Sequence, residues 1–400
     1  MTGGVAFVAS NDAHVVQFAP VMQELERRGV DAQLWSLDCV YNQGVTTCAA
    51  SLGIDVGTLA PGMRVSSSFY RRPVLAVWRD VLRCRRPFRE WIDSTSPDVV
   101  VVGNDRGLVE KLILNTARHH GARVVLVQDG VLAAVPPRPV TLRRRFYLAG
   151  KGVGSKALRL MGFSYMSASR YGEGGADVLC ASGPQGASVF RRLGVPADRI
   201  RITGQPRFDG LSPAVGSSEE SHHLVVAFTT PFADAGIGAD LQDRQTALLV
   251  DLARELRDRG IRFRVKRHPR ESPQTYADAF GDRLLTVDGS SGDVLRKCAV
   301  AVVGMSTVTD EAGLSGVPVV VPGQVVHAGR LDHHLPPADC YPRFESAPEG
   351  AAMIASLLED DLAREELRRR QQEAVSARIF VDPERSASLN VADAICSVMS

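Results

Sequence analysis

The segment VVGMSTVTDEAGLSGVPVVV (302–321) holds a strand, a helix and a second strand in close succession. Its first apolar run ends at Gly304, Ser306 and Thr307 follow where a helix begins, and a second apolar run starts at Val317. Strands that alternate with helices in this way form parallel sheets with helices on both faces. The segment therefore predicts an α/β fold.

The same alternation continues in both directions along the chain. Predicted strands lie at 5–10, 32–37, 98–105, 122–130, 177–182, 199–204, 223–230, 262–268, 283–289, 298–306 and 317–323. Predicted helices lie near 15–28, 108–119, 242–259 and 384–398, and two more fill 348–377. Between the two groups of elements, a stretch rich in Ser, Pro, Gly and acidic residues (211–221) is typical of a linker.

These patterns predict two doubly wound, Rossmann-like domains that face a cleft. The first covers residues 1–211, the second covers 222–377, and a C-terminal helix in 378–400 is expected to pack back on the first domain. A length of 400 residues suits two domains better than one.

The composition is that of a globular protein, with 44% hydrophobic residues and a net charge of +2. No apolar run reaches the ~18 residues of a transmembrane helix, and the N-terminus lacks the features of a signal peptide. The seven cysteines are scattered without a CxxC pair, which favours reduced thiols and a cytoplasmic protein.

A cationic group ends the predicted strand in RFRVKRHPRE (262–271). Lys266, Arg267 and His268 stand where the strand stops, and in parallel sheets ligands bind beyond the carboxyl ends of the strands. A histidine there can donate a charge-assisted hydrogen bond to a phosphate. The alternative is a basic strand end that is merely solvated.

Hydroxyl and carboxylate groups follow two other strands of the second domain. Backbone N–H groups at a helix start can bind phosphate, and an acid one turn further in can accept hydrogen bonds from a ribose diol. The alternative is local helix capping and favourable charge near the helix dipole. Because no GxGxxG follows any strand, these residues favour a nucleoside mono- or diphosphate over a dinucleotide. The residues concerned are Thr229, Thr230, Gly304, Ser306, Thr307, Asp310 and Glu311.

The first domain offers candidates for a general base at its strand ends. Asp129, which precedes a glycine, is the first choice, and Asp12 or His14 is the second. Each of these side chains can instead cap a loop. Gly204 and Gln205, in ITGQPRFDG (202–210), are expected to line the floor of the cleft and to assist phosphate binding.

The segment 130–172 contains no acidic residue, and its arginines and lysines are interleaved with aromatic and aliphatic residues. Such a stretch can lie on an anionic membrane or bind an anionic acceptor, or it can be a basic surface excursion without a ligand. No helix-turn-helix or zinc pattern appears, so no nucleic-acid partner is predicted.

The motifs KRHP, GMSTVTDEAGLSGVPVVV and TGQPRFD resemble those of bacterial surface-polysaccharide transferases of the GT-B fold. The similar groups are polysialyltransferases, CDP-glycerol glycerophosphotransferases of teichoic-acid synthesis, and sugar transferases associated with capsule export. By this resemblance Asp129 is the base, His268 binds the donor phosphate, and Ser306 and Thr307 assist. Gln128 stands where the polysialyltransferases have an acidic residue.

The same segments more distantly resemble the non-hydrolysing UDP-N-acetylglucosamine 2-epimerases. Their GTRPE segment is replaced here by ASNDAHVVQFAP (9–20), and their HPNP by HPRE (268–271). The catalytic acids and bases of that family are therefore not recognisable in this chain.

We predict a glycosyltransferase of bacterial glycan or capsule synthesis. It would move a sugar or a polyol phosphate from a nucleotide-activated donor to a hydroxyl of a saccharide or lipid-linked acceptor. Direct displacement without a metal is expected, since no DxD-type pair stands at a strand end, and the nucleotide arrives with the donor rather than as a cofactor. The expected location is cytoplasmic, with peripheral membrane contact through 130–172. The alternatives are a nucleotide-sugar 2-epimerase or hydrolase, and a non-catalytic polysaccharide-assembly factor on the same scaffold.

Overall fold

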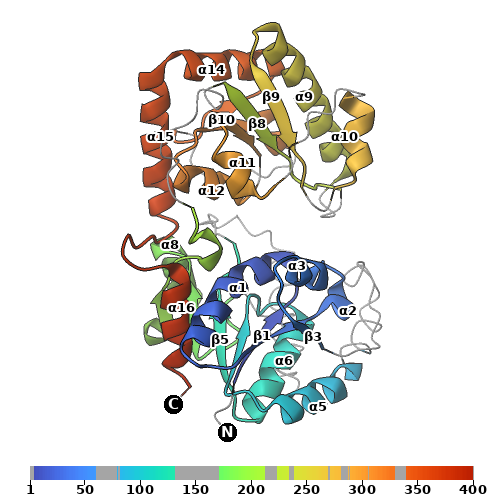
Figure 1. Ribbon diagram of the computed structural model, residues 1–400, viewed down its shortest axis with the longest axis vertical. Helices are drawn as coiled ribbons and strands as arrows, with labels where there is room; N and C mark the ends of the chain where they lie inside the picture. The colour runs from blue at the N-terminus through green and yellow to red at the C-terminus, as the bar shows by residue number, and fades with distance from the viewer. Residues whose placement is uncertain are drawn as a thin grey trace, which may run out of the picture. The chain divides into compact units, whose positions relative to one another are not determined.

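The computed structural model describes residues 4–59, 79, 82–130, 171–211, 223–233, 238–268, 271–280, 287, 289–304, 306–328 and 339–399. The chain folds into two compact units (Figure 1). The N-terminal unit contains the described residues up to 130, those of 171–209, and those from Arg378 onward. The C-terminal unit contains the described residues of Gly210–Ala377.

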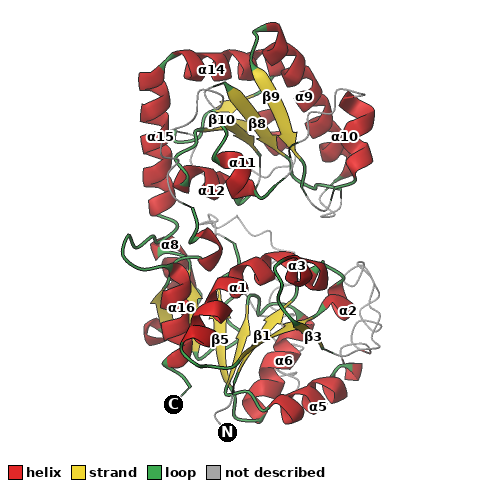
Figure 2. Cartoon of the chain, viewed as in Figure 1, coloured by secondary structure: helices red, strands yellow, loops and turns green. Residues whose placement is uncertain are grey.

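The N-terminal unit is built on a seven-stranded parallel sheet with the strand order β3-β2-β1-β4-β5-β6-β7. Figure 2 shows the strands of each unit as a layer between helices. The strands are β1 (Val5–Ala9), β2 (Ala32–Ser36), β3 (Val56–Thr58), β4 (Val99–Val102), β5 (Arg123–Val127), β6 (Val178–Ala181) and β7 (Ile200–Ile202).

Both faces of this sheet are buried, which explains the continuous apolar runs of its strands. Phe7 joins the core on the face covered by α1, α3 and α16, whereas Ala6 and Val8 join the core on the face covered by α5, α6 and α8. The helices of the unit are α1 (Asp12–Arg27), α2 (Asp38–Tyr41), α3 (Val45–Ser51), α5 (Arg85–Thr95), α6 (Leu108–His119), α8 (Pro184–Arg192) and α16 (Ala387–Cys396), with the 3-10 helices η3 (Ala197–Arg199) and η4 (Pro206–Phe208).

The end of the chain completes the N-terminal unit. Helix α16 packs beside α1 (Figure 1) and buries Val391 and Ile395 in the same core. The carboxylate of Asp209 accepts hydrogen bonds from the backbone N–H groups of Ala387 (2.6 Å) and Ser388 (2.8 Å), at the start of α16. A carboxylate at a helix N-terminus satisfies amide groups that have no partner within the helix.

The C-terminal unit holds a five-stranded parallel sheet with the order β12-β11-β10-β8-β9. Its strands are β8 (Leu224–Phe228), β9 (Arg262–Lys266), β10 (Val300–Val303), β11 (Val319–Pro322) and β12 (Arg343–Phe344). Its helices are α9 (Ala239–Asp258), α10 (Pro273–Phe280), α11 (Ser291–Leu295), α12 (Val308–Leu314), α13 (Gly323–Ala328), α14 (Ala347–Glu359) and α15 (Asp361–Ser376).

Each sheet has a point where the order of its strands reverses. In the N-terminal unit the chain passes from β1 to β2 and β3 on one side and then to β4 on the other. In the C-terminal unit it passes from β8 to β9 on one side and then to β10 on the other. In open α/β sheets, ligands bind beyond the carboxyl ends of the strands at such a point.

The predicted fold class is confirmed: both units are parallel α/β sheets covered by helices. Strands β3 and β12 were not expected from the sequence, because they are too short to form an apolar run. The strand predicted at 283–289 and the basic segment predicted at 130–172 lie almost entirely outside the described residues. Among the helices that the structure describes, none combines the length and apolar character needed to cross a bilayer. All seven cysteines lie in described segments as free thiols.

Candidate functional site

His14 lies beneath the carboxyl end of β1, in the first turn of α1. Asn11 caps that helix by accepting a hydrogen bond from the backbone N–H of His14 (2.9 Å). The imidazole is 1% exposed, and its Nδ1 accepts a hydrogen bond from the backbone N–H of Ser10 (3.2 Å). A ring nitrogen that accepts carries no proton, so the proton of the neutral imidazole is on Nε2. That atom lies 3.4 Å from Oδ2 of Asp129.

Asp129 follows β5, and β4 separates that strand from β1 in the sheet. The contact with His14 crosses β4 because Gly103, just beyond β4, leaves room: a Cβ there would lie 2.4 Å from His14 Nε2. Tyr171 links the ends of β4 and β5. Its hydroxyl donates to the carbonyl of Gly103 and accepts from the backbone N–H of Asp129, both at 2.8 Å.

The carboxylate of Asp129 keeps its negative charge at this position. Burial opposes the charge, but the nearby imidazole of His14, the charge of Arg207 and the nearby amide of Asn11 outweigh it. Together they lower the pKa of Asp129 below its ordinary 3.8. The side chain of Asp129 is 29% exposed, whereas that of His14 is 1% exposed. Of the two partners, Asp129 is therefore the one that a ligand can reach.

Asp12, the other acidic candidate of this unit, lies at the first position of α1. Its carboxylate accepts a hydrogen bond from the backbone N–H of Ala13 (3.0 Å), and its own N–H donates to the carbonyl of Gln43 (3.2 Å). These contacts fasten the start of the helix. The structure thus brings two of the three predicted candidates, Asp129 and His14, into contact.

Sequence inspection missed Glu110, a carboxyl group 3% exposed in α6. The hydroxyl of Tyr41 donates to its Oε2 (2.7 Å). Burial raises the pKa of Glu110 above its ordinary value, against the lowering effects of Tyr41, His14 and Ser10. A second, buried acid therefore lies near enough to His14 for the two groups to interact electrostatically. An acid in the first turn of a helix is common because it lies near the positive end of the helix dipole, so it gives no sequence signal of burial.

Gly204 and Gln205 follow β7 and belong to the N-terminal unit. Gly204 adopts a left-handed conformation (φ +82°), which favours glycine, and a Cβ there would lie 2.7 Å from the carbonyl of Phe380. Gln205 is 1% exposed, and its Nε2 donates to the carbonyl of Gly130 (2.9 Å). Both residues thus lie in the same unit as Asp129, while the phosphate-binding candidates lie in the other.

In the C-terminal unit, a buried carboxylate organises the carboxyl ends of β8 and β9. Glu271, 3% exposed, accepts hydrogen bonds from the hydroxyl of Thr229, the backbone N–H of His268 (3.0 Å), the amide of Gln242 (2.7 Å) and the hydroxyl of Tyr276 (2.8 Å). Burial raises the pKa of Tyr276, so its hydroxyl stays protonated and donates. Glu271 therefore fixes the turn that carries His268.

The three cationic candidates after β9 have different surroundings. The guanidinium of Arg267 donates to the backbone carbonyls of His268 and Glu271, which closes the turn. The backbone N–H of His268 donates to Thr229 Oγ1 (2.9 Å). Lys266, the last residue of β9, is paired with Phe228 of β8 and is half-buried, as are Arg267 and His268.

The strand-order reversal of this sheet, between β8 and β10, is occupied by Thr230 and Gly304. A Cβ on Gly304 would lie 3.7 Å from Thr230 Oγ1, so the two residues are neighbours. Ser306 lies just before the N-cap residue of α12, Thr307, and its hydroxyl accepts from the backbone N–H of Val308 (3.2 Å). Thr307 makes no side-chain cap hydrogen bond.

The two acids of α12 differ in exposure. Asp310 is 2% exposed and faces the interior of the unit, whereas Glu311 is half-buried. The hydroxyl of Thr229 is likewise used within the protein, between Glu271 and His268. Among the predicted nucleotide-side residues, those that are half-buried rather than buried are Lys266, Arg267, His268, Ser306, Thr307 and Glu311.

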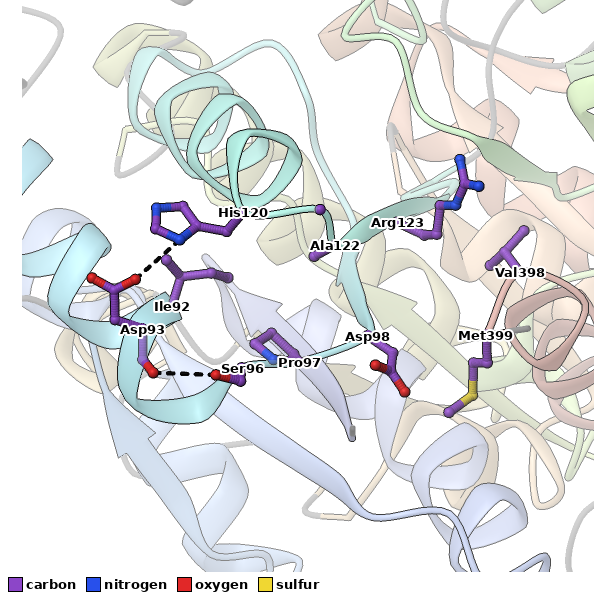
Figure 3. Close-up of a pocket in the computed structure, with 11 residues that line it drawn as sticks. Ile92, Asp93, Ser96, Pro97, Asp98, His120, Ala122, Arg123, Val398 and Met399 are labelled. Carbon is purple, nitrogen blue, oxygen red and sulfur yellow. Dashed lines mark hydrogen bonds and ion pairs between the residues drawn. The ribbon is translucent and has the colours of Figure 1, made fainter. Parts of the chain in front are cut away.

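A separate concavity of about 440 Å³ lies at the amino ends of strands in the N-terminal sheet (Figure 3). Asp98 and Arg123, which border it, stand at the amino ends of β4 and β5, and Val398 and Met399 line one side. His120 and Asp93 form an ion pair there at 3.0 Å. Ligands of doubly wound sheets bind at the carboxyl ends of the strands, so this concavity is separate from the candidate site.

The sequence matches no family model and no curated protein. Several solved structures have a similar fold. The UDP-GlcNAc 2-epimerase from Neisseria meningitidis bound to UDP-GlcNAc has a TM-score of 0.59 and 12% identity, over 98% of this chain and 100% of that one. The glycotransferase of kitacinnamycin has a TM-score of 0.57 and 13% identity, over 100% of both chains. A variant of a wall teichoic acid polymerase has a TM-score of 0.56 and 12% identity, over 100% of this chain and 89% of that one. The chain therefore has the fold of these proteins, two parallel α/β units of the GT-B type.

Proposed function

We propose that the protein is a glycosyltransferase that uses a nucleotide-activated donor. The observation that carries the proposal is the grouping of His268, Thr230 and Gly304 beyond three adjacent strands, β9, β8 and β10, around the strand-order reversal. This is the place where a doubly wound sheet binds a ligand. The residues there include a histidine, which suits a phosphate.

On the donor side, His268 and Lys266 would neutralise the phosphate that leaves with the nucleotide. Thr307, whose hydroxyl makes no cap hydrogen bond, would bind a phosphate oxygen, and Glu311 would accept hydrogen bonds from the ribose hydroxyls. The network around Glu271 would hold His268 in place before the donor arrives. Such preorganisation lowers the barrier because no reorganisation is needed as negative charge develops on the leaving phosphate.

On the acceptor side, Asp129 would take the proton of the attacking hydroxyl. As the oxygen of the acceptor forms its bond to the transferred group, the bond from that group to the leaving phosphate breaks. The proton passes from the hydroxyl to the carboxylate of Asp129. A carboxylate with a lowered pKa is a weak base, so it would accept the proton only as bond formation makes the hydroxyl acidic. His14 would orient the carboxylate.

The transferred group would be a sugar or a polyol phosphate, as in bacterial surface-polysaccharide synthesis. A fold shared with a wall teichoic acid polymerase and with a glycotransferase supports this class. A fold shared with a 2-epimerase bound to UDP-GlcNAc supports a second candidate, a nucleotide-sugar 2-epimerase, which needs no acceptor. Asp129 would then remove a proton from carbon rather than from a hydroxyl.

The two candidates separate in an assay that measures nucleotide release. Sugars activated with UDP, CDP, CMP, GDP and TDP are incubated with and without a mixture of saccharide acceptors. A transferase releases nucleotide only when an acceptor is present. The identity of the released nucleotide shows which activated sugar is the donor. A 2-epimerase incorporates deuterium at C2 of the sugar in D₂O without any acceptor. Absence of both reactions, with no nucleotide bound, would refute the proposal in favour of a non-catalytic scaffold.

A further inference from the structure

Arg207 occupies a rigid segment beside the proposed base. It lies in η4, directly after the turn at Gly204, and the next residues are anchored on both sides. Phe208 is 6% exposed, and Asp209 is bound to the first N–H groups of α16. Because Asp209 is committed to α16, it is not the partner of the neighbouring guanidinium.

The guanidinium of Arg207 makes no hydrogen bond or ion pair with any residue in the described part of the chain. Its Nε and Nη2 are shielded from solvent, yet both lack an acceptor there. The guanidinium carbon lies over the ring of Phe208, 4.8 Å from the ring centre. A guanidinium has five N–H donors and is always charged, and shielded donors without acceptors are unfavourable.

The segment that carries Arg207 adjoins Asp129, because the side chain of Gln205 donates to the backbone carbonyls of Gln128 (3.4 Å) and Gly130 (2.9 Å), the residues on either side of Asp129. The charge of Arg207 helps to lower the pKa of Asp129, without an ion pair between the two groups. The donors of Arg207 are therefore left for another acceptor near Asp129. Planar, paired N–H donors match the oxygens of a carboxylate or a phosphate. Stacking on the ring of Phe208 orients the guanidinium plane without using any of those donors.

We propose that Arg207 forms an anion-binding subsite, and that the acceptor carries a carboxylate or phosphate close to its attacking hydroxyl. This inference rests on the proposed function in one respect, since it treats the molecule bound beside Asp129 as an acceptor. Anion binding by Arg207 itself does not depend on that function. The substrate class is an acidic saccharide or a phosphorylated polyol.

The test is a set of calorimetric titrations with matched probes. Glucuronate and glycerol 3-phosphate carry the two kinds of anion, and glucose and glycerol are their neutral counterparts. The probes are titrated into the wild type, Arg207→Gln and Arg207→Lys. Arg201→Gln is the control, because Arg201 lies on β7 of the same segment, is exposed and donates to the carbonyl of Asp198 (2.6 Å). Circular dichroism verifies that each variant is folded.

We expect the wild type to bind at least one anionic probe and neither neutral one. Arg207→Gln should weaken that binding about tenfold or more, as for loss of hydrogen bonds to a charged group. Arg207→Lys should recover part of the lost affinity, because lysine keeps the positive charge but lacks the paired, planar N–H donors of a guanidinium. Arg201→Gln should bind like the wild type. Preference for glucuronate or for glycerol 3-phosphate identifies the anionic group of the acceptor.

Three results would overturn the subsite: no binding of either anion by the wild type, equal binding of the neutral probes, or equal affinity in Arg207→Gln and Arg201→Gln. Titration of nucleotides into the same samples tests the proposed function separately. Nucleotide binding should be the same in all four proteins. If the protein binds anions through Arg207 but binds no nucleotide, the anion-binding subsite is supported and the proposed transferase function is refuted.

Discussion

At the scale of single residues, the contact between His14 and Asp129 determines the chemistry proposed for the N-terminal unit. Asp129→Asn keeps the shape of the side chain and removes its basicity. We expect the rate of transfer to fall about 10²- to 10⁴-fold, with unchanged binding of the nucleotide. In the wild type, the lowered pKa of Asp129 should put the acid limb of kcat/KM below the ordinary carboxyl value of 3.8.

Asp12→Asn is the matched control for that variant, since Asp12 follows the same strand as His14 and its carboxylate fastens the start of α1 by accepting from the backbone N–H of Ala13. Kinetics of both variants across the pH range provide the measurement. An equal loss of transfer rate in Asp12→Asn and Asp129→Asn would show that the rate depends on the total negative charge beyond these strands, not on Asp129 itself. The base would then have to be sought elsewhere.

Glu110 gives a prediction about stability rather than activity. Its pKa in the folded protein is raised above the ordinary 4.5. Its favourable contribution to folding is therefore complete below pH 4.5 and is lost as the pH rises through the folded pKa. Glu110→Gln cannot ionise, so the variant should gain stability relative to the wild type as the pH rises from 4.5.

Urea unfolding of Glu110→Gln at a series of pH values measures this difference. Glu90→Gln is the control, because Glu90 is exposed and forms a surface ion pair with Arg86 on α5. A difference between wild type and Glu110→Gln that does not change with pH would mean that Glu110 ionises in the folded protein as it does in water.

The sequence alone suggested Asp129 and His14, because both follow apolar runs that end in polar residues. It did not predict that they meet. Their contact depends on the strand order β1-β4-β5 and on the missing side chain of Gly103, and both are properties of the tertiary structure. For the same reason Glu110 and Glu271 were missed: each is an ordinary acid in the sequence and becomes a buried one only through folding.

At the scale of elements, the carboxyl ends of β8 and β9 depend on Glu271. In Glu271→Ala the hydroxyl of Tyr276, the amide of Gln242 and the N–H of His268 lose their shared acceptor. Because the donors of Tyr276 and Gln242 are buried, we expect a loss of about 2–4 kcal/mol in the free energy of unfolding. Urea denaturation measures the loss, and weaker nucleotide binding should accompany it.

Glu255→Ala in α9 serves as the comparison, since Glu255 makes only a surface pair with Arg259. Its expected cost is about 0.3–0.5 kcal/mol. A cost for Glu271→Ala as small as that of Glu255→Ala would show that water or another group replaces the carboxylate. The turn would then not be preorganised by Glu271.

Long strands and amphipathic helices were predictable because burial on both faces requires continuous apolar runs, as in β4 and β10. Short edge strands were not. Strand β3 has no buried residue and β12 has two residues, so neither carries a periodic pattern. Their pairing is determined by the neighbouring strands β2 and β11 rather than by their own sequence.

At the scale of the whole molecule, the end of the chain belongs to the N-terminal unit, and Asp209 fastens it there. Asp209→Ala removes the acceptor for two N–H groups at the start of α16. We expect a loss of about 0.5–2 kcal/mol, the range for a lost helix cap. Hydrogen exchange in residues 387–398 should become faster, while exchange in the C-terminal unit stays unchanged.

Asp198→Ala is the control for the cap, because Asp198 lies in η3 of the same unit and is exposed. Equal exchange rates in Asp209→Ala and the wild type would show that apolar packing of Val391 and Ile395 holds the helix without the cap.

The central claim is that the C-terminal unit binds the nucleotide of an activated donor at His268. The most direct measurement is calorimetric titration of UDP, CDP, CMP, GDP and TDP into the wild type, His268→Ala and His223→Ala. His223 directly precedes β8, so it lies at the amino end of the strands rather than at their carboxyl end, and it is exposed. The account predicts that one nucleotide binds, that its affinity falls about tenfold or more in His268→Ala, and that His223→Ala leaves it unchanged. Binding of no nucleotide, or equal affinity in wild type and His268→Ala, would contradict it.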